Sequence, residues 1–384
     1  SIPKQTIGAQ ELFQALLKER AETGRIYIMN LDHCNTHSSF KDKVYMSNLC
    51  QEITLPTTPV QHIDDKEGEI ALCILSAINL GLLTDMNELE ELCDLSVRAL
   101  DEIIDYQEYP VEAAKISAQS RRSLGIGYIG LAHYLAKNQV KYEDKKAWKL
   151  VDKITEAFQF YLLKASNNLA KEKTKCLWFE KTKYSDGILP IDTYKKELDE
   201  IVKRDYTYDW EWLRKEIKEH GLRHSTLSAQ MPSESSSVVS NATNGVEPPR
   251  DYLSIKKSKK GPLKQIVPDY NRLKNYYTLL WDMKGNEGYI NIIAVMQKYF
   301  DQAISGNWSY NPENYKDGEV PLSVMAQDLL TTYKLGWKTA YYQNTYDAKS
   351  DIDEPVHPVG WHDGVEETPK EKKEDEEDCE ACTI

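Results

Sequence analysis

A sharp change in composition at Tyr346 limits how much of the 384-residue chain can form a core. Between Asp363 and Asp378 there are nine acidic residues against three lysines, and apolar residues almost vanish. Such a segment buries too little apolar surface to offset its conformational entropy, and its like charges repel. We therefore predict a folded body over residues 1–345 and a disordered acidic tail over residues 346–384.

The body alternates short apolar runs with helical patterns, which is typical of an α/β fold. Residues 70–77 form a continuous apolar run that suits a strand buried on both faces. Elsewhere, three- and four-residue spacing of apolar residues predicts helices. The expected helices span 8–20, 87–109, 148–173, 290–306 and 322–336, and the other expected strands span 25–29, 225–229 and 338–342.

Charge and hydropathy exclude several classes of protein. The 48 Lys and Arg residues against 61 Asp and Glu residues give a net charge of −13, whereas a general nucleic-acid binder needs a basic face. No apolar run approaches the roughly 18–20 residues of a membrane span, and the first ten residues lack the pattern of a signal peptide. Seven thinly spread cysteines form no disulfide framework. We therefore expect a cytoplasmic protein (host cytoplasm if viral) with no nucleic-acid or membrane partner.

Two signatures of cofactor or metal sites are present only in part. The run Gly125-Ile-Gly-Tyr-Ile-Gly130 matches the dinucleotide fingerprint letter for letter. A polar, helix-like segment precedes it instead of a hydrophobic strand, so we interpret its glycines as sites of close backbone packing. His33, Cys34 and His37 match no standard metal spacing, so we interpret them as satisfied polar or loop residues and predict no metal site.

An amide, a thiol and a carboxylate alternate at Asn48, Cys50 and Glu52. In an extended segment all three side chains point to one side, and burying such a set without a function is costly. A solvated strand face with a chance cysteine explains the pattern equally well. Cys73 lies in the apolar run 70–77 and by itself suggests an inert core thiol.

Three further groups each allow two interpretations. The serines of 232–237 follow an expected strand and are able to hold a phosphate at a helix start, although many helix caps bind nothing. The adjacent aromatics Tyr341 and Tyr342 are compatible with ordinary packing. Cys379 and Cys382 are separated by a Glu and an Ala. A flexible redox shuttle explains this pair better than half of a zinc site does.

Several specific motifs follow one another along nearly the whole chain. They are Arg25-Ile-Tyr-Ile, Asp32-His-Cys-Asn-Thr-His37, Ser47-Asn-Leu-Cys-Gln-Glu52, Arg121-Arg-Ser-Leu-Gly-Ile-Gly127, Met231-Pro-Ser-Glu-Ser-Ser236, the run from Ser240 to Pro249, Tyr341-Tyr-Gln-Asn344 and the pair Cys379 and Cys382. In this order they resemble the C-terminal half of the large (alpha) subunit of class I ribonucleoside-diphosphate reductase. The resemblance implies the second half of that family's ten-stranded α/β barrel, with a finger loop at about residues 45–60.

The resemblance also implies what the chain lacks. The family begins with an ATP-cone domain, a specificity-effector site and the first five barrel strands, one of which carries the first redox cysteine. We therefore expect one part of a split large subunit, which needs an N-terminal companion chain that binds the nucleotide effectors. We expect no cofactor on this chain, because the family's di-iron tyrosyl radical belongs to the small (beta) subunit.

The resemblance assigns roles to the residues inside the barrel. Cys50 matches the transient thiyl radical that removes the ribose 3′ hydrogen. Glu52 matches the base for the 3′-hydroxyl proton, and Asn48 matches the amide that holds this hydroxyl. Cys73 matches the second cysteine of the dithiol that reduces C2′ of a ribonucleoside diphosphate.

The remaining roles concern radical transfer, substrate binding and re-reduction. Tyr341 and Tyr342 match the stacked pair that relays the radical from the small subunit. Cys379 and Cys382 match the shuttle that re-reduces the active-site disulfide and is itself reduced by thioredoxin or glutaredoxin. The residues that match the loop around the substrate diphosphate are Pro232, Ser233, Glu234, Ser235 and Ser236.

Two rival functions stay open at this point. A catalytically inactive structural partner of an active enzyme would not need all eight of the catalytic, relay and tail residues. An unrelated thiol oxidoreductase would use only Cys379 and Cys382, but the thioredoxin-like βαβ context is missing. Activity after mixing with an N-terminal companion separates these functions.

Overall fold

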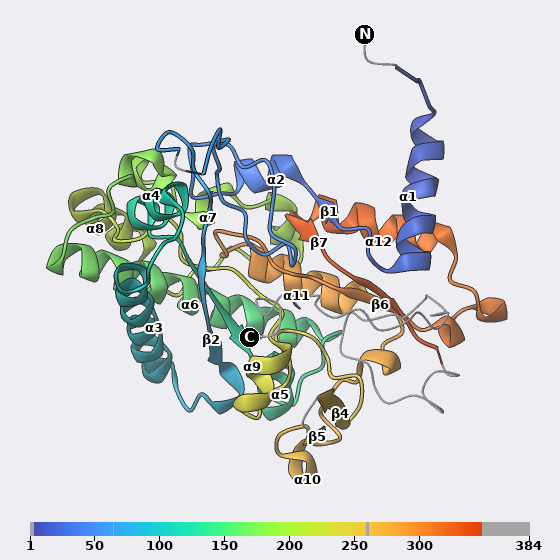
Figure 1. Cartoon of the computed structure of the whole chain (residues 1–384). Coiled ribbons are helices and arrows are strands. Elements are labelled where there is room, and N and C mark those ends of the chain that lie inside the picture. The colour runs from blue at the N-terminus through green and yellow to red at the C-terminus, as the bar shows by residue number, and fades with distance from the viewer. Residues whose placement is uncertain (1–3, 64, 259–260, 348–384) are drawn as a thin grey trace.

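A row of parallel extended segments runs through the protein. The computed structural model describes residues 4–63, 65–258 and 261–347 (Figure 1). β2 (Ile74–Asn79) pairs in parallel with β3 (Leu124–Ile129), and a parallel bridge joins β3 to residues 226–230. A second parallel bridge joins this segment to residues 302–305. β6 (Trp308–Tyr310) then pairs in parallel with β8 (Gln343–Thr345).

Helices connect successive segments of this row, as they do in α/β barrels. The predicted α/β alternation is therefore confirmed, although the described residues leave the row open and form no closed barrel. Within these residues, no helix is long and apolar enough to cross a membrane. In chain order, the other helices and strands are α1 (Ala9–Thr23), β1 (Ile28–Met29), α2 (Leu31–Thr36), α3 (Met86–Tyr106), α4 (Glu112–Arg121), α5 (Leu131–Lys137), α6 (Lys145–Glu172), α7 (Pro190–Thr193), α8 (Trp210–His220), α9 (Glu234–Val239), β4 (Leu253–Ser258), β5 (Gly261–Ile266), α10 (Tyr270–Leu273), α11 (Glu287–Gln297), α12 (Leu322–Lys334) and β7 (Thr339–Ala340).

The long helix α6 forms the centre of the hydrophobic core. It packs against α3, α8 and α11 (Figure 1), and side chains such as Phe158 and Leu162 are fully buried. Its apolar residues surround most of the helix, which is typical of a buried element. The helix predicted over 148–173 is thus confirmed. α3 begins just before the expected Asn87, because the Asp85 carboxylate caps it by accepting from the N–H groups of Asn87 and Glu88.

The helix predicted over 290–306 is wrong in its second half. α11 ends at Gln297, and residues 302–305 belong to the row of parallel segments. A short apolar run fits a buried helix and a buried strand equally well, so periodicity could not separate them. The strand predicted over 70–77 begins only at Ile74, and it is not buried on both faces, since the Leu75 side chain is 42% exposed.

Two shorter predictions are confirmed only in part. Of the strand expected over 25–29, only β1 is regular, and it pairs antiparallel with β7. Of the strand expected over 338–342, only β7 is regular, and Tyr341 and Tyr342 lie between it and β8, which begins after the predicted range. The glycines of the 125–130 run do allow close packing: a Cβ on Gly127 would lie 2.7 Å from the carbonyl oxygen of Ala229.

The buried carboxylate of Asp301 fixes two neighbouring segments of the row. Asp301 is 3% exposed. It accepts hydrogen bonds from the Tyr184 hydroxyl at 2.9 Å and from the backbone N–H groups of Leu227 and Ser228 at 2.9 and 2.8 Å. These bonds satisfy buried donors that the short parallel bridge leaves unpaired. Asp301 therefore holds residues 226–230 beside residues 302–305.

Replacing Asp301 should destabilise the fold strongly. Asp301→Ala removes the acceptor of these three buried donors and also of the Ser228 hydroxyl and the Gln159 side-chain amide, and each unsatisfied buried donor costs about 1–3 kcal/mol. We expect the free energy of unfolding, measured with urea, to fall by about 3 kcal/mol or more. Asp186→Ala is the matched control, because its carboxylate is 55% exposed and pairs only with Lys41 and so contributes roughly 0–1 kcal/mol. Equal losses in the two variants would contradict this account.

Candidate active site

The finger loop makes a tight turn at residues 48–51. The Gln51 N–H donates to the carbonyl oxygen of Asn48 at 3.1 Å, and Gln51 has a φ of +68°. The prediction that an extended strand aligns Asn48, Cys50 and Glu52 is therefore wrong in its geometry. The turn nevertheless brings the Asn48 and Glu52 side chains into hydrogen-bond contact.

Hydrogen bonds fasten this loop to the segment 302–305. The Ala303 N–H donates to the carbonyl oxygen of Glu52 at 3.0 Å. The Ser305 hydroxyl contacts the Cys50 carbonyl oxygen and the Glu52 carboxylate, the latter at 3.1 Å. Two elements far apart in the chain thus fix the position of the thiol and the carboxylate together.

The thiol and the carboxylate of the loop lie in different surroundings. Cys50 is half-buried, and the Tyr341 hydroxyl lies 3.6 Å from its Sγ. Glu52 is 2% exposed, and burial raises the pKa of its carboxyl, while hydrogen bonds from Asn48 and Ser305 oppose this rise. A buried carboxyl with a raised pKa is suited to accept and release a proton during a reaction.

Cys73 lies directly before β2, at the other end of the segment 302–305. The side-chain amide of Gln302 donates to Cys73 Sγ at 3.5 Å. Gly125 leaves room for the sulfur, since a Cβ there would lie 2.9 Å from Cys73 Sγ. Burial raises the pKa of the Cys73 thiol to about 12, and the nearby Glu52 carboxylate contributes to this rise. Cys73 is half-buried and close enough to the Glu52 carboxylate to interact with it, which is compatible with the role that the resemblance assigns to it; that role stays a prediction.

Three tyrosines form a cluster that leads to Cys50. The ring centroids of Tyr341 and Tyr342 lie 4.1 Å apart, and Tyr27 lies 4.7 Å from Tyr341 and 5.3 Å from Tyr342. Burial raises the pKa of Tyr341, and its hydrogen bonds with Tyr342 and Cys50 raise it further. The contacts therefore run without a gap from Tyr342 through Tyr341 to the Cys50 sulfur.

The serine-rich loop continues directly from the segment 226–230. Ser233 is 2% exposed and occupies the N-cap position of α9 without a side-chain capping bond, and its N–H donates to the Asn244 side chain at 3.1 Å. Glu234, Ser235 and Ser236 form the first turn of α9, where backbone N–H groups point out of the helix. The side chain of Pro232 is exposed at the entrance to this turn. The structure thus places the five predicted loop residues at the start of α9. This helix start follows the segment 226–230, which pairs with residues 302–305.

The remaining candidates lie elsewhere or outside the described residues. His37 bonds through both ring nitrogens and Cys34 contacts the carbonyl oxygen of Lys338, which supports their interpretation as satisfied residues. His33 bonds to the carbonyl oxygen of Trp337 through Nδ1, whereas its buried Nε2 has no hydrogen-bond partner among the described residues. Cys379 and Cys382 lie outside the described residues.

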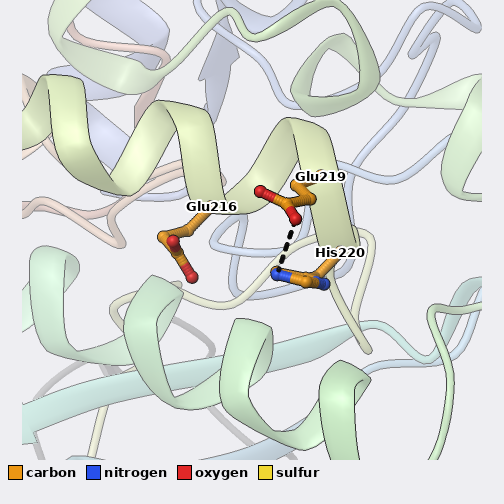
Figure 2. Close-up of side chains that lie close together, drawn as sticks. All are labelled: Glu216, Glu219 and His220. Carbon is orange, nitrogen blue, oxygen red and sulfur yellow. Dashed lines mark ion pairs between the residues drawn. The ribbon is translucent and has the colours of Figure 1, made fainter.

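One surface cluster holds possible metal ligands. Figure 2 shows that Glu219 and His220 face each other on α8, and a carboxylate oxygen of Glu216 also lies within 4.8 Å of their ligand atoms. The Glu216 carboxylate already pairs with Lys171. Exposed acidic groups of this kind are common without an ion, and we assign this cluster no function.

A family model described as the ribonucleotide reductase barrel domain matches residues 1–343. The chain belongs to this family. The ribonucleoside-diphosphate reductase alpha subunit of Haemophilus influenzae is 58% identical over 359 residues, which cover 93% of this chain and 48% of that relative. The corresponding subunit of Escherichia coli is 56% identical over 95% of this chain and 48% of its own length. The subunit of Enterobacteria phage T4 is 41% identical over 100% of this chain and 49% of its own length.

The chain spans about half the length of these relatives and matches their C-terminal half. The resemblance noted from the motifs is thereby confirmed. Ser305, Gln302 and Tyr27 were not predicted as site residues from the sequence. Tyr27 could have been found, because it lies inside the motif Arg25-Ile-Tyr-Ile. Gln302 and Ser305 lie in the second half of the helix predicted over 290–306, which is an extended segment in the structure.

The buried Glu52 carboxyl should make stability depend on pH. Its folded-state pKa lies above the ordinary value of about 4.3, so the folded chain binds this proton more tightly than the unfolded chain does. The stability that the protonated Glu52 carboxyl contributes is fully present below the unfolded-state pKa of about 4.3. It is lost as the pH rises through the folded-state pKa. Glu52→Gln removes the charge, so we expect the variant to gain stability relative to the wild type as the pH rises from about 4 to about 8.

This prediction is checked by urea unfolding at a series of pH values. The exposed Glu11→Gln serves as the control and should show no such trend. A stability difference between Glu52→Gln and the wild type that does not change with pH would contradict the assigned burial effect.

Proposed function

We propose that this chain carries the catalytic thiols of a ribonucleoside-diphosphate reductase and reduces ribonucleoside diphosphates to 2′-deoxyribonucleoside diphosphates. The observation that carries the proposal is the unbroken contact from Tyr342 through Tyr341 to Cys50, with Glu52 and Cys73 beside it. A rigid hydrogen-bonded frame holds these groups together, as chemistry on one bound ribose requires. The names of the relatives support the same activity.

The first chemical steps use the tyrosine pair and the finger loop. Tyr341, once oxidised, takes a hydrogen atom from the Cys50 thiol, and the thiyl radical then takes the 3′ hydrogen of the ribose. Glu52 accepts the proton of the 3′-hydroxyl, and Asn48 holds that hydroxyl. The raised pKa of Glu52 favours this proton transfer. The radical itself originates from the di-iron centre of a small (beta) subunit.

Cys73 takes part in the reduction at C2′. The 2′-hydroxyl leaves as water, while Cys73 and a partner thiol supply two electrons and two protons and become a disulfide. The Cys50 thiol then returns its hydrogen atom to C3′ and becomes a thiyl radical again. We assign the diphosphate to the start of α9, where the N–H groups of residues 234–236 are able to bind an anion. Cys379 and Cys382 are proposed to re-reduce the disulfide and to receive electrons from thioredoxin or glutaredoxin.

An N-terminal companion chain supplies the second thiol and the other half of the barrel in this proposal. β2 pairs on one side only within the described residues. Apolar side chains beside this edge and on the finger loop are exposed, with Leu75 at 42%, Met46 at 59% and Leu49 at 61%. An uncovered strand edge flanked by apolar side chains is a site for pairing with another chain. We place the nucleotide effectors on this companion, and the assembly in the cytoplasm.

A catalytically inactive structural partner is the second candidate. It would need the exposed edge but not the contacts of Tyr341 with Cys50 or of Ser305 with Glu52. Retention of both sets of contacts favours the enzyme.

Reconstitution tests the proposal directly. We expect no deoxynucleotide from this chain and the small subunit alone, because Cys73 lacks its partner thiol and the barrel is open. Adding the companion chain should give turnover with thioredoxin as the reductant. Turnover without the companion would overturn the two-chain arrangement, and no turnover in the complete mixture would favour the structural partner.

The relay is tested by removing single hydroxyl groups. Tyr341→Phe or Tyr342→Phe should abolish turnover in the complete mixture, because each ring still packs but no longer forms a tyrosyl radical. Substrate binding should change little. Tyr128→Phe is the matched control. Its buried hydroxyl bonds to the Thr155 hydroxyl and, among the described residues, to no tyrosine of the relay. Normal activity in either relay variant would show that the radical bypasses that residue.

A further inference from the structure

Gln302 connects the finger loop with the redox thiol. Its side chain is fully buried, at 0% exposure. Its Oε1 accepts from the Thr54 N–H at 3.2 Å, and its Nε2 donates to the Leu124 carbonyl oxygen at 3.0 Å and to Cys73 Sγ at 3.5 Å. One amide thus contacts the loop of Cys50, the start of β3 and the sulfur of Cys73.

The neighbours of this amide determine which of its ends faces the sulfur. The Thr54 N–H is only a donor, so it requires the oxygen of the Gln302 side chain. The Leu124 carbonyl oxygen is only an acceptor, so it requires the nitrogen. Turning the amide over would break both bonds. The N–H group is therefore directed at Cys73.

The charged groups that face Cys73 oppose ionisation of its thiol. Glu52 on the finger loop and Asp301 beside Gln302 are both acidic, and each raises the pKa of the thiol in addition to the effect of burial. The Gln302 amide acts in the opposite direction. A hydrogen bond donated to a sulfur stabilises its charged form.

We propose that Gln302 is a positioning residue for Cys73, which holds the sulfur beside β3 and stabilises its thiolate. In thiol–disulfide exchange, an attacking thiolate forms a new S–S bond while the other sulfur leaves as a thiolate, which then takes a proton from water. When a thiolate attacks the other sulfur of the Cys73 disulfide, Cys73 is released as a thiolate. The importance of Gln302 for turnover rests on the proposed function, but its effect on the thiol does not.

Alkylation of Cys73 in the full chain tests the proposal. The wild type and Gln302→Met are treated with iodoacetamide between about pH 7.5 and 9.5, and labelling of each cysteine is followed by peptide mass spectrometry. Loss of one hydrogen bond to a charged group shifts a pKa by about one unit, so Cys73 should react about tenfold more slowly in the variant at each pH. A purely structural role predicts the opposite, because a loosened site exposes the thiol and speeds its reaction.

Two further variants and an internal reference keep the result interpretable. Gln297→Met is the matched control, because its buried amide donates to the carbonyl oxygens of Phe300 and Gln302 and not to a sulfur. It loosens the same segment without removing a donor from Cys73, so it should not slow the labelling of Cys73. Gln302→Leu repeats the loss with another shape. Protection of the buried thiols reports folding in every sample; these are Cys34, Cys93 and Cys176.

The outcomes separate this inference from the proposed function. Slower labelling of Cys73 in folded Gln302→Met or Gln302→Leu supports the inference, even if no mixture reduces nucleotides. Unchanged or faster labelling overturns it, even if the complete mixture is active. In an active mixture, re-reduction by a dithiol should be slowed by Gln302→Met and partly restored at higher pH. Gln297→Met should show no such pH-dependent recovery.

Discussion

The polar anchoring of the segment 301–305 determines where the reactive groups lie. Asp301 holds the neighbouring strand segment, Gln302 contacts the redox thiol, and Ser305 contacts the loop of Cys50. Behind the segment, the fully buried Lys338 donates to the carbonyl oxygens of Asp301 and Gln302, both at 2.8 Å. Burial lowers the pKa of Lys338 to about 7. A buried amine is tolerated only with such partners, so Lys338 fixes the segment through its backbone carbonyl groups.

The open edge of the row explains features that are unusual for a folded body. Apolar side chains such as Leu49 and Leu75 are exposed beside polar groups that are firmly held. The core around α6 is buried and includes Ile78 of β2, so the chain has a packed interior directly behind the open edge even though its barrel row is incomplete.

Apolar spacing was sufficient to predict α3 and α6, because a helix buried on one core must repeat its apolar face. It failed after Gln297, where contacts with residues far away in the chain decide between helix and strand. Ser305 meets Cys50 across 255 positions, and Gln302 meets Cys73 across 229. No local pattern records such contacts. The resemblance carried by the motifs assigned roles to the loop residues, but the turn at Gln51 that brings Asn48 and Glu52 together was not predicted.

In the proposed function, the space around the tip of the finger loop has to stay open for a nucleotide. The loop is held at its base by hydrogen bonds, which each contribute only about 0.5–1.5 kcal/mol, and by the packing of Leu55 with Phe40 and Val44. The tip, with Leu49 61% exposed, has no cover of its own. The thiyl radical proposed for Cys50 would need shielding from water. In the proposed two-chain barrel, the surface that covers the tip would also complete the dithiol, so assembly and protection of the radical would be a single event.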